Sequence, residues 1–242
     1  MKKSPFAAAA VAFLAITACK PIQRDHTYDY DYPKPSREFL LRWIGTPSGV
    51  ALWVSTADDG EDNGRYEGIQ FLVDPGSPTD VEAVVLPALA RNGLPKGHPL
   101  AYVVLTSSDA QALAGAQRVA KEFTGVEIVG APRGALSAKG KAVPAAAKLD
   151  VGPEISARLF RSSNDGVDAL ALLIRFIDVQ ILLLPGHAEG IADALAESVG
   201  EKMEKEGLHT TLVFAAGGAA LSAHALEHLD PEVVVGTGGT SS

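Results

Sequence analysis

The sequence predicts an α/β fold in which two mixed β-sheets pack back to back and helices cover the outer faces. Two observations support this prediction. Hydrophobic patterns over residues 39–130 follow the order strand, strand, strand, helix, strand, helix, strand, and residues 155–235 repeat the theme. The chain has 242 residues, 47% of them hydrophobic, which is ample for one sizeable core. We therefore expect a single four-layer domain over residues 36–242.

In the first half, alternating apolar residues indicate strands, apolar residues at helical spacing indicate helices, and Gly or Pro marks the turns. The turn GTPSG separates the first two strands, and Gly93 ends the first helix. The expected elements are two strands within 39–56, a strand over 66–74, a helix over 80–92, a strand over 102–105, a helix over 110–123 and a strand over 125–130.

The second half begins with an Ala/Gly/Lys-rich segment, 131–148, which we interpret as a solvated linker. The expected elements after it are strands over 155–160, 170–176 and 179–184, a helix over 191–206, a strand over 211–214, a glycine-rich turn, a helix over 222–229 and a last strand over 233–235.

The N-terminus has the pattern of an export signal. Lys2 and Lys3 precede an apolar run over 6–16, and Ile-Thr-Ala-Cys19 resembles a bacterial lipobox. The run is shorter than the roughly 20 residues that span a bilayer as a helix. Cys19 is the only cysteine, and acylation, for example with palmitate, gives it a reason. We expect a signal peptide over 1–18 and a lipidated Cys19 with a flexible tether over 19–35, whose alternating Tyr and Asp also fit a partner strand.

Charge bears on the partner. The formal net charge is −8, whereas phosphate binding relies on clustered Lys and Arg. The basic residues of the linker, Arg133, Lys139, Lys141 and Lys148, are spread among alanines without interleaved aromatics. The sequence therefore disfavours nucleic acid and leaves the membrane, reached through Cys19, and an unidentified protein as the expected partners.

The segment VVLTSSDAQALAG, residues 103–115, resembles the first metal-ligand motif of the metallo-β-lactamase superfamily, T-H-x-H-x-D-H-x-G-G. The chain is most similar to the C-terminal domain of the ComEC DNA-uptake proteins, where the motif is T-H-P-D-x-D-H-x-G-G. Aligned on Thr106, the ligand positions are occupied by Ser107, Asp109, Gln111 and Ala112. The resemblance implies the αββα sandwich fold, and only Asp109 keeps a metal-binding side chain.

Three further segments extend the resemblance over about 39–237. They are FLVDPGSPTDVEAVVLPALARNGL, SSNDGVDALALLIRF with ILLLPGHAEG, and TLVFAAGGAALSAHALEHLDPEVVVGTGG. The resemblance aligns the bridging aspartate with His187, and two later histidines with Ala216 and Gly217. The implied pocket then holds Ser107, Asp109, Gln111, His187 and Glu189. Because a divalent site wants three or more converging ligands, these departures imply a degenerate site with no metal cofactor.

Several alternatives stay open. Asp109, His187 and Glu189 could form a rebuilt site for zinc or manganese in a phosphodiesterase-like or nuclease-like hydrolase, whereas Asp109 also fits a helix cap. Ser107 or Ser108 could act as a nucleophile with His187 as base, or cap the helix. His224, Glu227 and His228 form the pattern H-x-x-E-H. This pattern resembles the zinc-binding helix of the inverted zincins, but it also fits an exposed stripe on an ordinary helix.

The sequence leads us to expect an exported, lipid-anchored, non-catalytic domain that acts as a binding or assembly module at the membrane surface. In a host with two membranes, the lipobox implies the outer membrane, facing the periplasm.

Overall fold

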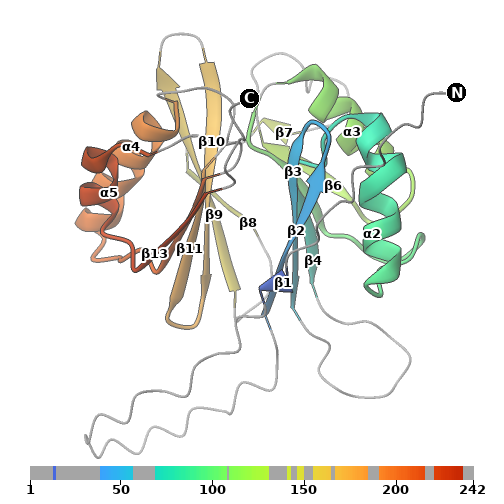
Figure 1. Cartoon of the computed structure of the whole chain (residues 1–242), viewed down its shortest axis with the longest axis horizontal. Helices are drawn as coiled ribbons and strands as arrows, with labels where there is room; N and C mark the ends of the chain where they lie inside the picture. Colours follow the sequence, from blue (N-terminus) through green and yellow to red (C-terminus); the bar gives the residue numbers. More distant parts are fainter. Residues whose placement is uncertain are drawn as a thin grey trace, which may run out of the picture.

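The computed structural model describes residues 13–14, 39–56, 69–107, 109–130, 141–142, 146–149, 155–164, 167–184, 191–215 and 221–236. They form four layers, in which two sheets lie face to face and helices cover the outer face of each (Figure 1). The sequence-based prediction of two mixed sheets with helices outside is confirmed.

The first sheet has the strand order β1-β2-β3-β4-β5-β6-β7. Its strands are β1 (Phe13–Leu14), β2 (Phe39–Thr46), β3 (Gly49–Thr56), β4 (Gln70–Val73), β5 (Tyr102–Leu105), β6 (Glu127–Gly130) and β7 (Lys141–Ala142). The pairs from β1 to β4 are antiparallel, and those from β4 to β7 are parallel. The parallel part brings the carboxyl ends of β4, β5 and β6 to one edge of the layer.

The helices on this sheet are α1 (Pro78–Asp80), the π-helical segment η1 (Val81–Val85), α2 (Leu86–Arg91) and α3 (Ala110–Ala120). The expected helix over 80–92 thus starts earlier and changes pitch in the middle. Ser77 and Asp80 form a capping box at its start, which satisfies free backbone N–H groups. Val81 and Val85 of the π-helical segment are both buried in the core between the first sheet and its helices.

The second sheet has the order β13-β12-β11-β10-β9-β8. Its strands are β8 (Ala146–Leu149), β9 (Ile155–Asn164), β10 (Val167–Phe176), β11 (Val179–Leu184), β12 (Leu212–Ala215) and β13 (Val233–Gly236). The pairs from β8 to β11 are antiparallel and those from β11 to β13 are parallel, which mirrors the first sheet. Helices α4 (Ile191–Lys205) and α5 (Ala223–Leu229) cover its outer face (Figure 1).

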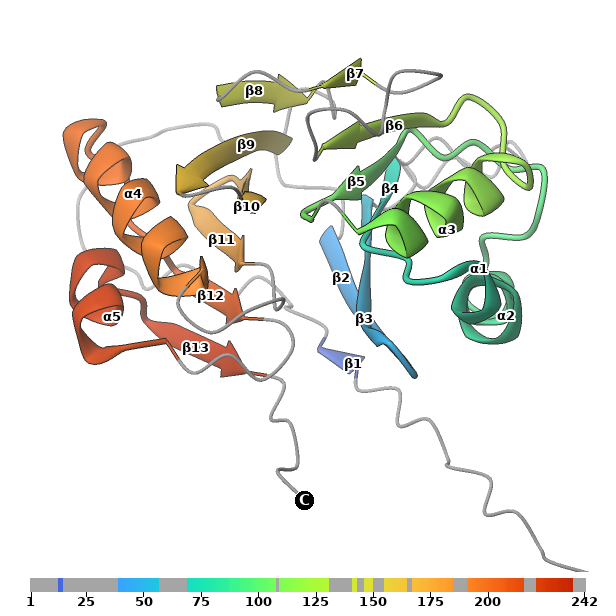
Figure 2. The ribbon, with the colours of Figure 1, turned by 90° about the horizontal axis from the view of Figure 1, so that it is seen from above.

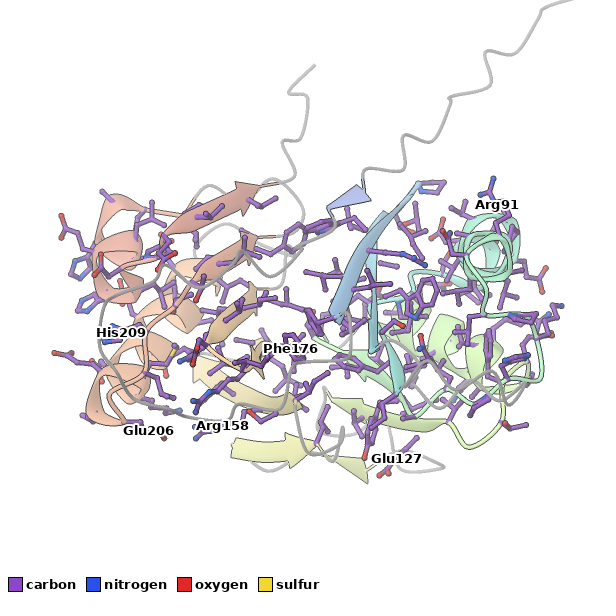
Figure 3. The ribbon with its side chains drawn as sticks, turned by 90° about the horizontal axis from the view of Figure 1, so that it is seen from below. Arg91, Glu127, Arg158, Phe176, Glu206 and His209 are labelled. Atoms are coloured by element: carbon purple, nitrogen blue, oxygen red, sulfur yellow. The ribbon has the colours of Figure 1, made fainter. Side chains whose placement is uncertain are left out.

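Three apolar cores hold the layers together. The central one lies between the sheets, where Phe39 stacks on Phe176 with ring centroids 5.2 Å apart and Trp43 contacts Phe214 at 5.3 Å. Figure 3 shows Phe176 pointing into this space. The other two cores lie between each sheet and its helices. Burying apolar area on both faces of each sheet is the main force that assembles the sandwich.

The expected linker over 131–148 was wrong in part, because it contains β7 and β8. These strands pair with the free edges of β6 and β9. β9 and β10 are also longer than expected and meet in a hairpin that pairs Asn164 with Val167. These residues adopt strand conformation because they pair with a neighbouring strand, and not because of their local strand propensity.

Candidate functional site

The candidate site lies where β4 and β5 end, because the family resemblance locates its first ligands there. Asp74 directly follows β4 and Thr106 directly follows β5. The Asp74 carboxylate accepts hydrogen bonds from the backbone N–H of Thr106, at 2.8 Å, and from the Thr106 hydroxyl. Asp74 adopts a left-handed backbone conformation, φ 47°, which aspartate tolerates better than most residues. This carboxylate therefore fixes the start of the motif loop.

The loop is also joined to the second sheet. Ser107 forms an antiparallel bridge with Ala169 of β10, and the Leu170 N–H donates to the Thr106 carbonyl at 2.8 Å. Ser107 is only 8% exposed. Its hydroxyl has no hydrogen-bond partner among the residues that the structure describes. The first ligand position is thus a buried contact between the two sheets.

Asp109 and Gln111 lie at the start of α3. The Asp109 carboxylate accepts a hydrogen bond from the Gln111 N–H at 2.9 Å, as an N-cap residue does. Both side chains are exposed, whereas Ala112 is buried in the core between α3 and the sheet. The capping interpretation of Asp109 is therefore confirmed.

The remaining predicted site residues lie outside the described part of the chain. They are Cys19, Ser108, His187, Glu189 and the two aligned positions Ala216 and Gly217. Their proposed roles stay predictions.

Gly115 and Gly76 allow the elements around the site to pack closely. The sequence analysis assigned neither of them a role. A Cβ on Gly115 of α3 would lie 1.9 Å from the Gly76 carbonyl oxygen, so α3 packs directly on the turn that follows Asp74. A Cβ on Gly76 would meet the Asp80 carboxylate at 2.9 Å. That buried carboxylate accepts hydrogen bonds from the Ser77 N–H and hydroxyl and from the Ser48 hydroxyl. The only sign of this close packing in the sequence was Gly115, the glycine at the end of the segment VVLTSSDAQALAG.

The donor set in the described part of the pocket does not fit a divalent metal. It consists of a serine in a strand bridge, a carboxylate that caps a helix, an exposed amide and a buried alanine. Within the described residues, no group of three or more His, Cys, Asp or Glu side chains could hold a metal ion. We therefore derive no metal-dependent step for this site.

The H-x-x-E-H helix is α5. His224 and His228 lie with their ring centroids 4.6 Å apart, and His224 Nε2 is 3.9 Å from Glu197 Oε1 of α4. His224, Glu227 and His228 are exposed on the outer surface. This arrangement agrees with the interpretation of the motif as a surface stripe.

A depression of about 430 Å³ lies at the opposite end of the second sheet, where α4 leads to β12 and α5 leads to β13. Met203, His209, Glu227 and His228 are among its lining residues. Figure 3 shows His209 on this outer side of the molecule. The candidate site lies where β4 and β5 of the first sheet end, so the depression is separate from it.

Comparisons with known proteins identify the fold. No protein-family model matches the sequence, and no curated protein matches it. Among solved structures, the apo chemotaxis sensor ODP from T. denticola has a TM-score of 0.54 at 13% identity, covering 82% of this chain and 90% of that one. A metallo-β-lactamase with a HARLDQ motif from Cronobacter sakazakii gives 0.51 at 11%, with 72% and 74% covered.

A third structure, the E377D mutant of the β-hydroxylase CmlA, has a TM-score of 0.52 at 14% identity. The match covers 82% of this chain but 45% of CmlA. Solved structures that are named metallo-β-lactamases share the arrangement of this chain, so the chain has the metallo-β-lactamase fold. At these sequence identities the similarity establishes the fold alone. The function has to be inferred from the residues of the site.

Proposed function

We propose that this protein is an exported lipoprotein, anchored to the membrane through Cys19, whose degenerate, ComEC-like metallo-β-lactamase domain is non-catalytic and binds or assembles with a partner at the membrane surface. The observation that carries the proposal is the use of Asp109. The one retained ligand type in the motif caps α3 by accepting from the Gln111 N–H, and it lies exposed at the helix start.

The neighbouring positions support the same proposal. Ser107 joins the two sheets through its bridge to Ala169, and Asp74 is engaged by Thr106. The loop that carries metal ligands in the resembling family therefore serves here as a structural junction. Roles other than hydrolysis occur on this fold, since one structural neighbour is named a chemotaxis sensor.

The anchoring half of the proposal depends on the lipobox at Ile16 to Cys19. No helix in the described part of the chain is both long and apolar enough to cross a membrane. We expect the full chain, expressed in a bacterium, to incorporate labelled palmitate and to appear in the membrane fraction. A Cys19→Ala variant should lose the label, and a labelled variant or an unlabelled wild type would contradict lipidation at Cys19.

The non-catalytic half is tested by metal content. We expect the purified mature protein, grown with added zinc and manganese, to carry far less than one metal per chain by inductively coupled plasma mass spectrometry. Stoichiometric metal that is lost in both Asp109→Ala and His187→Ala would overturn this half. It would instead support a rebuilt metal-dependent hydrolase.

A further inference from the structure

The two sides of the sandwich end in different strands, and we call the side of β1 and β13 the open side. β7 and β8, which follow each other in the chain, are the edge strands of the two sheets on one side (Figure 2). On the opposite side the edges are β1 with β2 in the first sheet and β13 in the second. Within the described residues, β13 pairs with β12 alone, and β2 has only the two-residue β1 as its outer neighbour.

The strand on this open side belongs to the export signal. Phe13 pairs with Arg42 and Leu14 with Leu41, in antiparallel orientation. The inference rests on the proposed function, in which cleavage before Cys19 removes residues 1–18 and with them β1. The mature protein then presents the eight-residue β2 as an edge strand, and unpaired edge N–H and C=O groups are a template for another strand.

The open side is also apolar. Val233 and Val234 of β13 are 49% and 47% exposed, and they are two of the three large hydrophobic side chains found exposed in the described residues. Trp43, Val50 and Val235 are partly buried against the core between the sheets. Both sheet edges on this side therefore carry apolar residues next to the central core.

Charged residues, which commonly protect an edge strand from pairing, do not protect this one. Arg42 is the only charged residue of β2. Its guanidinium carbon lies 4.7 Å from the centre of the Trp53 ring, and its Nη1 donates to the Asn92 carbonyl at 3.3 Å. These contacts direct the charge toward the helix-covered face, and β13 carries no charge at all.

We propose that β2 of the mature protein pairs antiparallel with β2 of a second copy, which joins the first sheets of two molecules into one continuous sheet. A two-fold axis perpendicular to the sheet, between the two copies, pairs identical edge strands antiparallel, which is the direction that β1 adopts on this edge. The same axis brings the exposed valines of β13 to the interface.

One register suits the side chains. When Leu41 opposes Leu41 of the second copy, Phe39 opposes Trp43 on the face of the central core and Leu40 opposes Arg42 on the other face. Aromatic pairs across an antiparallel ladder are favourable, and this register keeps the two Arg42 side chains from facing each other.

The test compares two forms of the chain by sedimentation velocity in the same mild detergent. The polypeptide that starts at Lys20 lacks β1 and should form a dimer, whereas the full chain with Cys19→Ser keeps its leader and should be monomeric. Amide hydrogen exchange of the dimer should show added protection over Phe39–Thr46. A monomeric Lys20 chain, or a dimer whose added protection lies elsewhere, overturns the proposal.

A pair of variants tests the register. Leu40→Lys places a like charge opposite Arg42 of the second copy, whereas Leu40→Glu places an opposite charge there. Both lose the same leucine, so a difference between them reports the cross-strand pair. We expect the dimer dissociation constant of the Lys variant to be at least about tenfold higher than that of the Glu variant, because like charges directly opposite each other are destabilising. Equal dissociation constants would contradict the pairing.

The two proposals fail separately. An intact mass that retains residues 1–18 in the exported protein overturns cleavage and anchoring. A monomeric chain starting at Lys20 overturns the edge pairing, whatever the fate of the leader.

Discussion

The carboxylate of Asp74 accepts hydrogen bonds from both the backbone N–H and the hydroxyl of Thr106, which joins the ends of two adjacent parallel strands. This contact sets where the motif loop begins. Ser107 then forms a bridge to β10, and Asp109 caps α3. Thr106, Ser107 and Asp109 therefore all have structural roles.

Replacing Asp74 with Asn should destabilise the fold by about 1–3 kcal/mol. Asparagine tolerates the left-handed backbone, but it removes the charge that both Thr106 groups donate to, and an amide N–H₂ cannot accept. Urea denaturation followed by circular dichroism measures the change. Asp178→Asn, in the exposed turn between β10 and β11, is the matched control and should be nearly neutral.

Gly115→Ala should lower stability by about 1–3 kcal/mol, although alanine favours helices more than glycine does. The added methyl would lie 1.9 Å from the Gly76 carbonyl oxygen, so α3 must move away from the turn. Gly45→Ala is the control, because a Cβ there meets nothing within 4 Å. A stabilised Gly115→Ala variant in thermal melts would show that α3 does not pack this closely.

Asp109→Ala should cost about 1 kcal/mol through loss of the helix cap, whereas Asp109→Asn should leave stability almost unchanged, since asparagine caps equally well. Chemical denaturation of both variants separates the two roles of this residue. If Asp109 instead acted as a metal ligand, both variants would lose the same metal-dependent stabilisation, and adding a chelator to the wild type would mimic them.

The ion pair between Arg158 and Glu206 should make stability depend on pH. Its hydrogen bonds lower the pKa of Glu206, and Figure 3 shows the two side chains together between β9 and the end of α4. A lowered folded-state pKa stabilises the protein above the unfolded carboxyl pKa, and this contribution is lost as the pH falls through the folded pKa.

Glu206→Gln should therefore melt at a lower temperature than the wild type at pH 7, with the gap closing below about pH 4. The neighbouring exposed Glu204→Gln is the control. A gap that persists unchanged at acid pH would assign the effect of Glu206→Gln to packing rather than charge.

The fold was largely predictable because most elements bury one face in a regular pattern. β5 and α3 lie close to their predicted bounds, since an apolar run and a helical spacing leave little choice. β7 and β8 were missed because their alanines and lysines have weak strand propensity, and only the edges of β6 and β9 make them strands.

The site was predictable only in its local parts. The cap of α3 is visible from Asp109 and the residues that follow it. The contacts of Thr106 and Ser107 are not, because Asp74 lies 32 residues away in the sequence and Ala169 belongs to the other sheet. Such contacts depend on which strands become neighbours, which a single sequence does not state locally.

The passage from β7 to β8 also has a consequence for folding. Among the described residues, every strand of the first sheet comes from residues up to Ala142, and every strand of the second comes from Ala146 onward. Neither sheet waits for a strand from the other half, so each can form as its own segment of chain becomes available during synthesis. We therefore expect the late step to be the docking of the two sheets, which brings Phe39 onto Phe176 and Trp43 onto Phe214.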